Sequence, residues 1–359
     1  MRLGLFMMPL HGLGRNLGDT LAEDREAIIL ADRLGFDEAW VGEHLTASTE
    51  PITSPLIFLA SLLDEARRIR LGPGVLALPH HHPATLAGQC ALFDHLSGGR
   101  LLLGIGPGGL ASDQELYGVL GLADRGERMI ESVEMMQAIW AGEPPWRFEG
   151  RFWRFSVEKS LQVELGIGPM LKPLQQPHPP IAVSVLGYRT GLAQLAGEKG
   201  WSPISANFVP AEVIASHWDM YAKGCASRGL AADPSNWRVA RSVLVTPTDG
   251  EAMDYLARKR SGLQFYYRYL CDQLCAAGQA RNFKADPAMP DSDLTDHYLL
   301  NTMVIAGSPS TVAEKLKALR ATIGNFGTLL VAAHDWDEPA LWRRSLELLA
   351  SEVRDRLRD

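Results

Sequence analysis

The sequence lacks three features, and each absence excludes a class of protein. It has four cysteines in 359 residues, which is too few for a disulfide scaffold. It contains no basic run, and its formal charge of -7 argues against nucleic acid as a partner. No apolar stretch is long enough to cross a bilayer. We therefore expect a cytoplasmic protein that binds neither nucleic acid nor a membrane.

What the sequence does contain is a regular alternation of apolar strands and amphipathic helices. The first four strand patterns are "RLGLFMMP", "FDEAWVGEH", "RIRLGPGVLAL" and "GRLLLGIG", and helix patterns separate them. An aromatic, proline-rich excursion follows, and then four more strands, the last being "GTLLVAAHDW". Eight such units predict an α/β fold, the (β/α)8 TIM barrel, with residues 1–359 in a single domain.

Two local features refine this prediction. Thr20 and Glu23 have the spacing of a capping box, so the first long helix is expected to begin at Thr20. Residues 247–307 separate the seventh strand from the next clear helix. An insertion of this length in a compact domain is typical of a lid, and we predict a lid here.

The segment "GRLLLGIGPGG" could hold a cofactor in more than one way. Gly104, Gly106 and Gly109 match the G-x-G-x-x-G fingerprint of dinucleotide-binding folds. They follow the fourth strand rather than the first, however, and Pro107 has no N–H to offer a phosphate. A glycine turn without any ligand is one alternative. A barrel mouth at which a flat cofactor approaches Gly106 fits the pattern better.

Several segments together resemble the bacterial luciferase-like, flavin-dependent monooxygenases. They are "FDEAWVGEHL", "RIRLGPGVLALPHHHPATLAGQCALFDHLSGGRLLLGIGPG", "GERMIESVEMMQAIW", "FEGRFWRF", "PHPPIAVS" and "VIAGSPSTVAEKL". Within them, "LPHHHP" and "GIGPGGLASD" are similar to the limonene monooxygenase-like branch. The resemblance implies an oxidoreductase that uses FMN, bound as FMNH2, together with O2. Its expected substrate is a small apolar organic molecule such as a terpene, ketone or aldehyde, into which one oxygen atom is inserted.

Histidines near the strand ends are the candidate catalytic residues. His44 follows the second strand, at the carboxyl mouth where the active sites of this fold lie, and an imidazole exchanges protons near neutral pH. The resemblance implies that His44 acts as an acid or base at the flavin; a bond to Glu43 is the purely structural alternative. The run His80–His82 invites a metal interpretation, but adjacent loop residues rarely converge on one ion. We expect no metal, and we expect His81 to line the substrate side of the mouth.

The resemblance also implies residues that bind the flavin. Gly74 and Val75 are expected to form a bulge with a cis peptide bond behind the central ring, unless the segment is a simple Gly-Pro-Gly bend. Ser112 and Asp113 are candidates for the ribityl chain, although Ser-Asp is also an ordinary helix cap. A glycine turn and a helix start suit a phosphate after the fifth strand. The residues assigned to it are Gly187, Arg189, Thr190 and Gly191.

An apolar chamber is expected above the flavin, unless its residues are ordinary core. Its candidate lining residues are Met7, Met8, Trp40 and Phe208. Because the sequence offers no convincing NAD(P)H fingerprint, a separate NAD(P)H:flavin reductase is expected to supply the reduced flavin. Relatives pair through their early helices, which implies a homodimer. Two other functions stay open: F420-dependent hydride transfer on the same barrel, and a non-catalytic flavin-binding protein.

Overall fold

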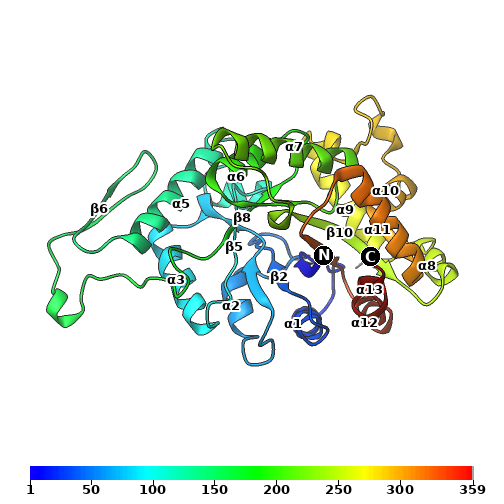
Figure 1. Ribbon diagram of the computed structural model, residues 1–359, viewed down its shortest axis with the longest axis horizontal. Coiled ribbons are helices and arrows are strands. Elements are labelled where there is room, and N and C mark those ends of the chain that lie inside the picture. The colour runs from blue at the N-terminus through cyan, green and yellow to red at the C-terminus, as the bar shows by residue number, and fades with distance from the viewer. Residues whose placement is uncertain (358–359) are drawn as a thin grey trace.

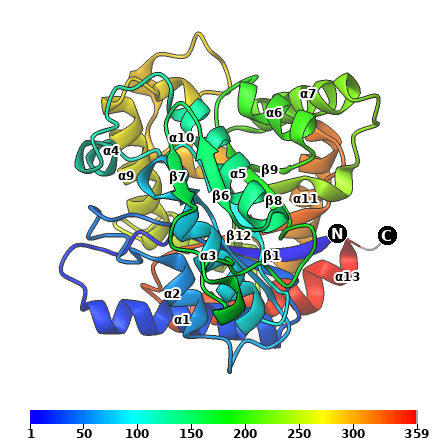
Figure 2. The same ribbon diagram turned by 90° about the vertical axis from the view of Figure 1, so that its left-hand side faces the viewer.

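The predicted barrel is present, with its strands inside a layer of helices (Figures 1 and 2). The computed structural model describes residues 1–357. Neighbouring strands of the ring are all parallel. In ring order they are β1 (Arg2–Met7), β2 (Glu38–Val41), β3 (Arg70–Pro73) continued by β4 (Leu76–Ala77), β5 (Leu103–Gly106), β8 (Ile181–Val185), β9 (Ser202–Ser205), β10 (Arg238–Val245) and β12 (Thr328–Ala333).

The ring closes through its first and last strands. β1 pairs with β2 on one side and with β12 on the other, where Arg2 lies opposite Thr328. Across the interrupted third segment, β4 pairs with β5, and a bridge between Leu71 and Leu101 completes the contact. Side chains alternate along each strand, so one set fills the barrel and the other faces the helices. The set inside the barrel is Phe6, Trp40, Leu102, Ala182, Ile204, Ala240 and Leu330.

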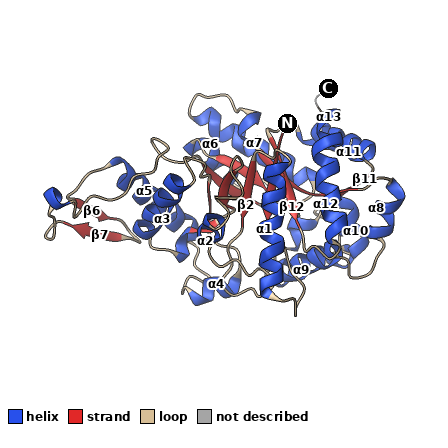
Figure 3. Cartoon of the chain, turned by 90° about the horizontal axis from the view of Figure 1, so that it is seen from below, coloured by secondary structure: helices blue, strands red, loops and turns tan. Residues whose placement is uncertain are grey.

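Helices cover the outside of the barrel, and Figure 3 shows them around the central strands. They are α1 (Leu17–Arg33), α2 (Pro55–Ala60), α3 (Pro83–Leu96), α4 (Ala111–Leu116), α5 (Arg125–Ala141), α6 (Gly191–Lys199), α7 (Ala211–Ser227), α8 (Asp249–Leu256), α9 (Gly262–Ala276), α10 (Asp296–Met303), α11 (Pro309–Ile323), α12 (Pro339–Leu348) and α13 (Arg354–Arg356). Within residues 1–357, none of these helices combines the length and apolar character that a membrane span requires.

The predicted start of the first helix is wrong by one turn. Asn16 caps α1 by accepting hydrogen bonds from Gly18 N at 2.8 Å and Asp19 N at 3.2 Å. Thr20 lies inside the helix, where its hydroxyl donates to the Leu17 carbonyl oxygen at 3.0 Å. An asparagine is as good a cap as a threonine, so the earlier residue begins the helix.

The insertion 247–307 is built mainly of helices. It contains α8, α9 and α10, and it ends in β11 (Val304–Gly307), a strand that was not predicted and that pairs with β10. Helix α9 reaches the carboxyl end of the barrel strands: the Tyr267 hydroxyl lies 2.7 Å from Ser242 Oγ of β10. The Tyr266 hydroxyl lies 3.1 Å from Asn207 Nδ2, just beyond β9.

The proline-rich excursion forms an arm between α5 and β8. Its strands, β6 (Trp146–Glu149) and β7 (Arg154–Val157), make an antiparallel hairpin. In Figures 1 and 3 the arm stands away from the barrel. It therefore leaves the mouth of the barrel to the loops that follow the parallel strands.

Candidate active site

His44 is held by a carboxylate from the helix that follows β5. The side chain follows β2, and its Nδ1 lies 3.0 Å from Oδ2 of Asp113 in α4. Asp113 Oδ1 in turn accepts hydrogen bonds from Thr46 N at 2.9 Å and from Thr46 Oγ1 at 2.6 Å. Thr46 Oγ1 also lies 2.6 Å from Ser112 Oγ. The predicted residues His44 and Ser112 are thus brought together, and Asp113 fixes the orientation of the imidazole.

The charges of this pair reinforce each other. Burial alone would raise the pKa of Asp113, but hydrogen bonds from His44 and Thr46 outweigh it and lower the pKa to about 2. Burial would lower the pKa of His44, but the carboxylates of Glu50 and Asp113 outweigh burial, and the pKa is raised overall. The nearby carboxylates therefore stabilise the protonated form of His44, and the side chain, which is 19% exposed, can still pass its proton to a ligand.

A second imidazole–carboxylate pair lies beside the first. His81 Nε2 makes a short hydrogen bond to Glu43 Oε1. The other oxygen of Glu43 is buried and has no hydrogen-bond partner among the described residues, and the same is true of His80 Nε2. The His80 ring stacks on Tyr117 with centroids 4.7 Å apart. Polar atoms left unpaired at the mouth are expected to meet a polar ligand or water.

The segment between β3 and β4 has the predicted cis peptide bond, between Gly74 and Val75. Gly106, at the end of β5, lies against it: a Cβ at Gly106 would come within 2.6 Å of Val75 Cγ2. Trp40 packs on the other side, since a Cβ at Gly74 would lie 2.8 Å from Trp40 Cβ. A side chain at either glycine would collide with its neighbour, so both positions need glycine for this close packing.

The proposed phosphate residues lie at the start of α6. Thr190 caps the helix, and its side chain accepts a hydrogen bond from Leu192 N. Arg189 has a φ of 51° and donates its main-chain N–H to Ser216 Oγ, while its guanidinium makes no hydrogen bond or ion pair within residues 1–357. A Cβ at Gly191 would have no atom within 4 Å among the described residues, apart from its chain neighbours and the backbone of its own helix. This helix start is open to an anion.

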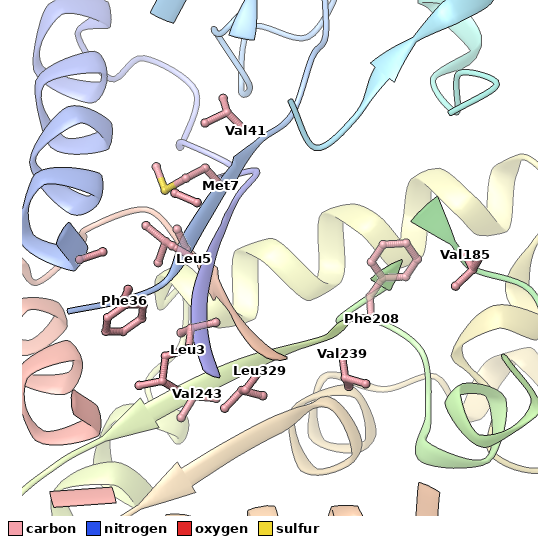
Figure 4. Close-up of a cluster of buried hydrophobic side chains, with 14 of the residues drawn as sticks. Leu3, Leu5, Met7, Phe36, Val41, Val185, Phe208, Val239, Val243 and Leu329 are labelled. Carbon is pink, nitrogen blue, oxygen red and sulfur yellow. The ribbon is translucent and has the colours of Figure 1, made fainter. Parts of the chain in front are cut away.

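The four residues expected around the substrate fall into two groups. Met7 and Met8 line one small pocket together with His44. Trp40 is fully buried inside the barrel, and Phe208 packs on Phe283 with ring centroids 5.8 Å apart. In Figure 4, Met7 lies near Leu5 of β1, whereas Phe208 lies well apart from both. The structure therefore places the two methionines beside His44, Trp40 beside Gly74 and Phe208 beside Phe283.

An ionic cluster joins the loop after β1 to the loop after β12. His11 Nδ1 lies 2.6 Å from Asp335 Oδ1, and its Nε2 lies 3.3 Å from Asp24 Oδ2. Arg15 Nη1 donates to the same Asp335 oxygen at 2.6 Å. Burial would lower the pKa of His11, but the hydrogen bonds to Asp24 and Asp335 outweigh it and raise the pKa to about 9. The cluster ties two neighbouring strands together beside the mouth.

The free energy of unfolding is expected to decline above pH 6.5 because of His11. Protonated His11 stabilises the fold fully below its ordinary pKa of 6.5, and this contribution is lost as the pH rises through about 9. The difference corresponds to roughly 3 kcal/mol. Denaturant unfolding at pH 6.5 and at pH 9 checks this, with His11→Gln expected to show the smaller decline. Equal declines in both proteins would assign the pH dependence to other groups.

The residues of this mouth fit a flavin mononucleotide. The bulge at Gly74 and Val75 offers a surface for a flat ring, and the unpaired atoms of Glu43 and His80 suit a polar ring edge or hydroxyls. The open start of α6 suits a phosphate. When bound, FMN would supply the redox chemistry, which no side chain of the mouth provides.

Comparisons with known proteins agree with this geometry. The model of the luciferase-like monooxygenase family matches residues 1–325. The 4-hydroxyprotoasukamycin monooxygenase of Streptomyces nodosus subsp. asukaensis is 32% identical, over 98% of this chain and 91% of that protein. The limonene 1,2-monooxygenase of Rhodococcus erythropolis is 30% identical, over 98% of this chain and 85% of that protein.

One solved structure is similar in fold as well as in sequence. It is the oxygenating constituent of 3,6-diketocamphane monooxygenase from Pseudomonas putida, a type II Baeyer-Villiger monooxygenase in complex with FMN. It superposes with a TM-score of 0.89 at 30% identity, covering 99% of this chain and 98% of that one. The sequence motifs, the barrel and the family model therefore agree, and the chain belongs to the luciferase-like monooxygenase family.

Proposed function

We propose that this chain, a flavin-dependent monooxygenase with FMN as its cofactor, uses O2 to insert one oxygen atom into a small apolar organic substrate of the terpene, ketone or aldehyde type. The observation that carries the proposal is His44, fixed by Asp113 at the carboxyl mouth of the barrel. Relatives that act on limonene and diketocamphane, both apolar carbon skeletons, support the class of substrate.

His44 is the group that moves a proton during oxygenation. Asp113 holds Nδ1, so Nε2 is the nitrogen that remains free to give or take a proton. Met7 and Met8 provide apolar walls beside it and help to exclude water, which would otherwise carry protons to the reacting atoms. We further propose that Glu43 and His81 bind the polar part of the ligand, and that Ser112 assists in the same role.

The test is an anaerobic titration of the protein with photoreduced FMN, followed by mixing with ¹⁸O2 and a panel of terpenes and ketones. Binding of FMNH2, O2 consumption and a product that carries one ¹⁸O atom are expected. Binding of F420 in place of FMNH2 would make the chain a hydride-transfer enzyme. Flavin binding without O2 consumption under any condition would make it a carrier.

Arg189→Ala is expected to raise the dissociation constant for FMN about tenfold or more, because a charge-assisted hydrogen bond to the phosphate is lost. Fluorescence quenching of free FMN measures this constant. Riboflavin, which lacks the phosphate, serves as the control ligand, and its affinity is expected to stay the same. An equal loss for both ligands would place Arg189 outside the phosphate site. Arg147→Ala, on the exposed arm, is the matched control variant.

Four further properties complete the proposal. A separate NAD(P)H:flavin reductase supplies FMNH2, in keeping with the oxygenase component known for a related trigonelline monooxygenase. The insertion 247–307 acts as a lid, since α9 already contacts the strand ends. The chain works as a homodimer in the reducing cytoplasm, where its four thiols, Cys90, Cys225, Cys271 and Cys275, stay free.

A further inference from the structure

Glu50 is a nearly buried carboxyl group whose ion-pair partner within residues 1–357 is His44. It lies in the loop between β2 and α2, and its side chain is 11% exposed. Glu50 Oε2 lies 3.7 Å from His44 Nε2, which is too long for a direct hydrogen bond. Within residues 1–357 its carboxyl group makes no hydrogen bond, although its main-chain N–H donates to Ala47. The group therefore faces the free nitrogen of the proposed acid and base.

We propose that Glu50 is a positioning residue that controls the proton on His44 Nε2; this rests on the proposed function, which it deepens. Protonated His44 gives its Nε2 proton to the Glu50 carboxylate, leaving a neutral imidazole whose Nδ1–H still donates to Asp113 and a neutral carboxylic acid. The reverse transfer restores both charges. Glu50 thus returns a proton to the His44 imidazole, and no proton from bulk water is needed.

Asp113 cannot take this role, because its oxygens are already occupied. Oδ2 binds His44, and Oδ1 accepts from Thr46 N and Thr46 Oγ1. These hydrogen bonds keep Asp113 ionised at any physiological pH, as its lowered pKa shows. Glu50 has no such fixed donors, so its carboxyl group can turn toward Nε2. Asp113 orients the ring and Glu50 exchanges the proton.

The pocket around Glu50 suits a proton relay. Glu50 and His44 line it together with Met7, Met8 and Ile52, among other residues, and it has room for about one water molecule. A single bridging water, or a small rotation of the carboxyl group, closes the gap of 3.7 Å. The apolar walls prevent other water from competing for the proton.

The charged and titratable groups that face Glu50 come from four elements besides its own loop. The charged groups are Asp113 of α4, His11 of the loop after β1 and Asp24 of α1, in addition to His44, and the neutral phenol of Tyr266 in α9 is the fourth. Burial raises the pKa of Glu50 to about 7, despite the opposing charge of His44. Glu50 is therefore protonated below about pH 7 and ionised above it, where its charge helps His44 to keep its proton.

The test is an NMR titration of the ten histidines in cofactor-free protein labelled with ¹⁵N-histidine, with His44 assigned by its loss in His44→Gln. In Glu50→Gln the titration midpoint of His44 is expected to move to lower pH, because the carboxylate charge is gone. Glu50→Asp keeps the charge at a shorter reach, so its midpoint is expected between those of wild type and Glu50→Gln. Glu65→Gln, at an exposed glutamate, is the matched control and should leave the midpoint unchanged.

An unchanged His44 midpoint in Glu50→Gln and Glu50→Asp overturns the proposal, whether or not the protein oxygenates a substrate. A shifted midpoint in a protein that consumes no O2 would instead uphold the role of Glu50 and reject the proposed function. In active enzyme, the pH profile of turnover in Glu50→Gln is expected to move in the same direction as the His44 midpoint. A structural role alone would lower turnover at every pH and leave the shape of the profile unchanged.

Discussion

Replacing His44 by alanine is expected to reduce oxygenation by about 10²- to 10⁴-fold while FMN still binds, because acid–base catalysis by one positioned side chain contributes rate enhancements of this size. His44 is held at 3.0 Å by Asp113, and its Nε2 is left facing a pocket rather than a second hydrogen-bond partner. Alanine removes the proton carrier and leaves the bulge at Gly74 and Val75 in place. The affinity for FMN is therefore expected to stay near that of wild type in this variant, while the rate of oxygenation falls.

Single-turnover kinetics with preloaded FMNH2 measure the loss of chemistry, and fluorescence titration measures the binding. His297→Ala is the matched control, since His297 is exposed on α10 and, within residues 1–357, its ring makes hydrogen bonds to Asn301 alone. Oxygenation by His44→Ala at the rate of wild type would remove His44 from the mechanism. A loss of FMN affinity equal to the loss of rate would make it a binding residue instead.

Replacing Arg238 by methionine is expected to lower the free energy of unfolding by roughly 3 to 5 kcal/mol, because it leaves a buried carboxylate without its counter-charge. Arg238 Nε and Nη2 donate to the two oxygens of Glu38 at 2.7 and 2.9 Å. Their side chains are 6% and 3% exposed, and the guanidinium lies 5.2 Å from the ring centre of Trp40. The pair closes the amino end of the barrel interior.

Denaturant unfolding of three variants tests the role of this pair. The double replacement Glu38→Met with Arg238→Met should recover most of the stability that Arg238→Met loses, because no charge then stays buried alone. Arg147→Met removes an exposed arginine and should change the stability little. If Arg238→Met proved as stable as the double variant, Glu38 would have to find another partner or water.

The alternation of strands and helices allowed the barrel to be predicted from the sequence, because each strand pairs with a neighbour in the order of the chain. The short strand β11 was missed, since "VIAG" offers only four residues and lies at the end of an irregular insertion. Its pairing with β10 depends on where α8, α9 and α10 place it, which no local pattern encodes.

The positions of the candidate site residues in the fold could be predicted in part. His44 follows a strand, and a barrel puts every such residue at the same mouth, so its position could be inferred from one motif. The two carboxyl groups that act on His44, those of Asp113 and Glu50, could not be inferred in this way. Asp113 is 69 residues away in sequence and has the pattern of a helix cap. Glu50 lies in the segment "TASTE", which has neither the helix nor the strand pattern of apolar residues. Its position beside His44 follows only from the way this loop folds against the pocket.

β1 is the first strand along the chain, but in the closed ring it pairs with β12 on one side and β2 on the other, as every other strand of the ring has two neighbours. Arg2 lies opposite Thr328, and Arg354 of α13 donates to the Gly35 carbonyl oxygen at 3.1 Å, beside the end of α1. The start of β1 and helix α13 therefore lie on one side of the ring (Figure 1). A circular permutant, with the old ends joined by a short linker and new ends in the mostly exposed loop 228–233, retains every pair of neighbouring strands and every loop of the mouth.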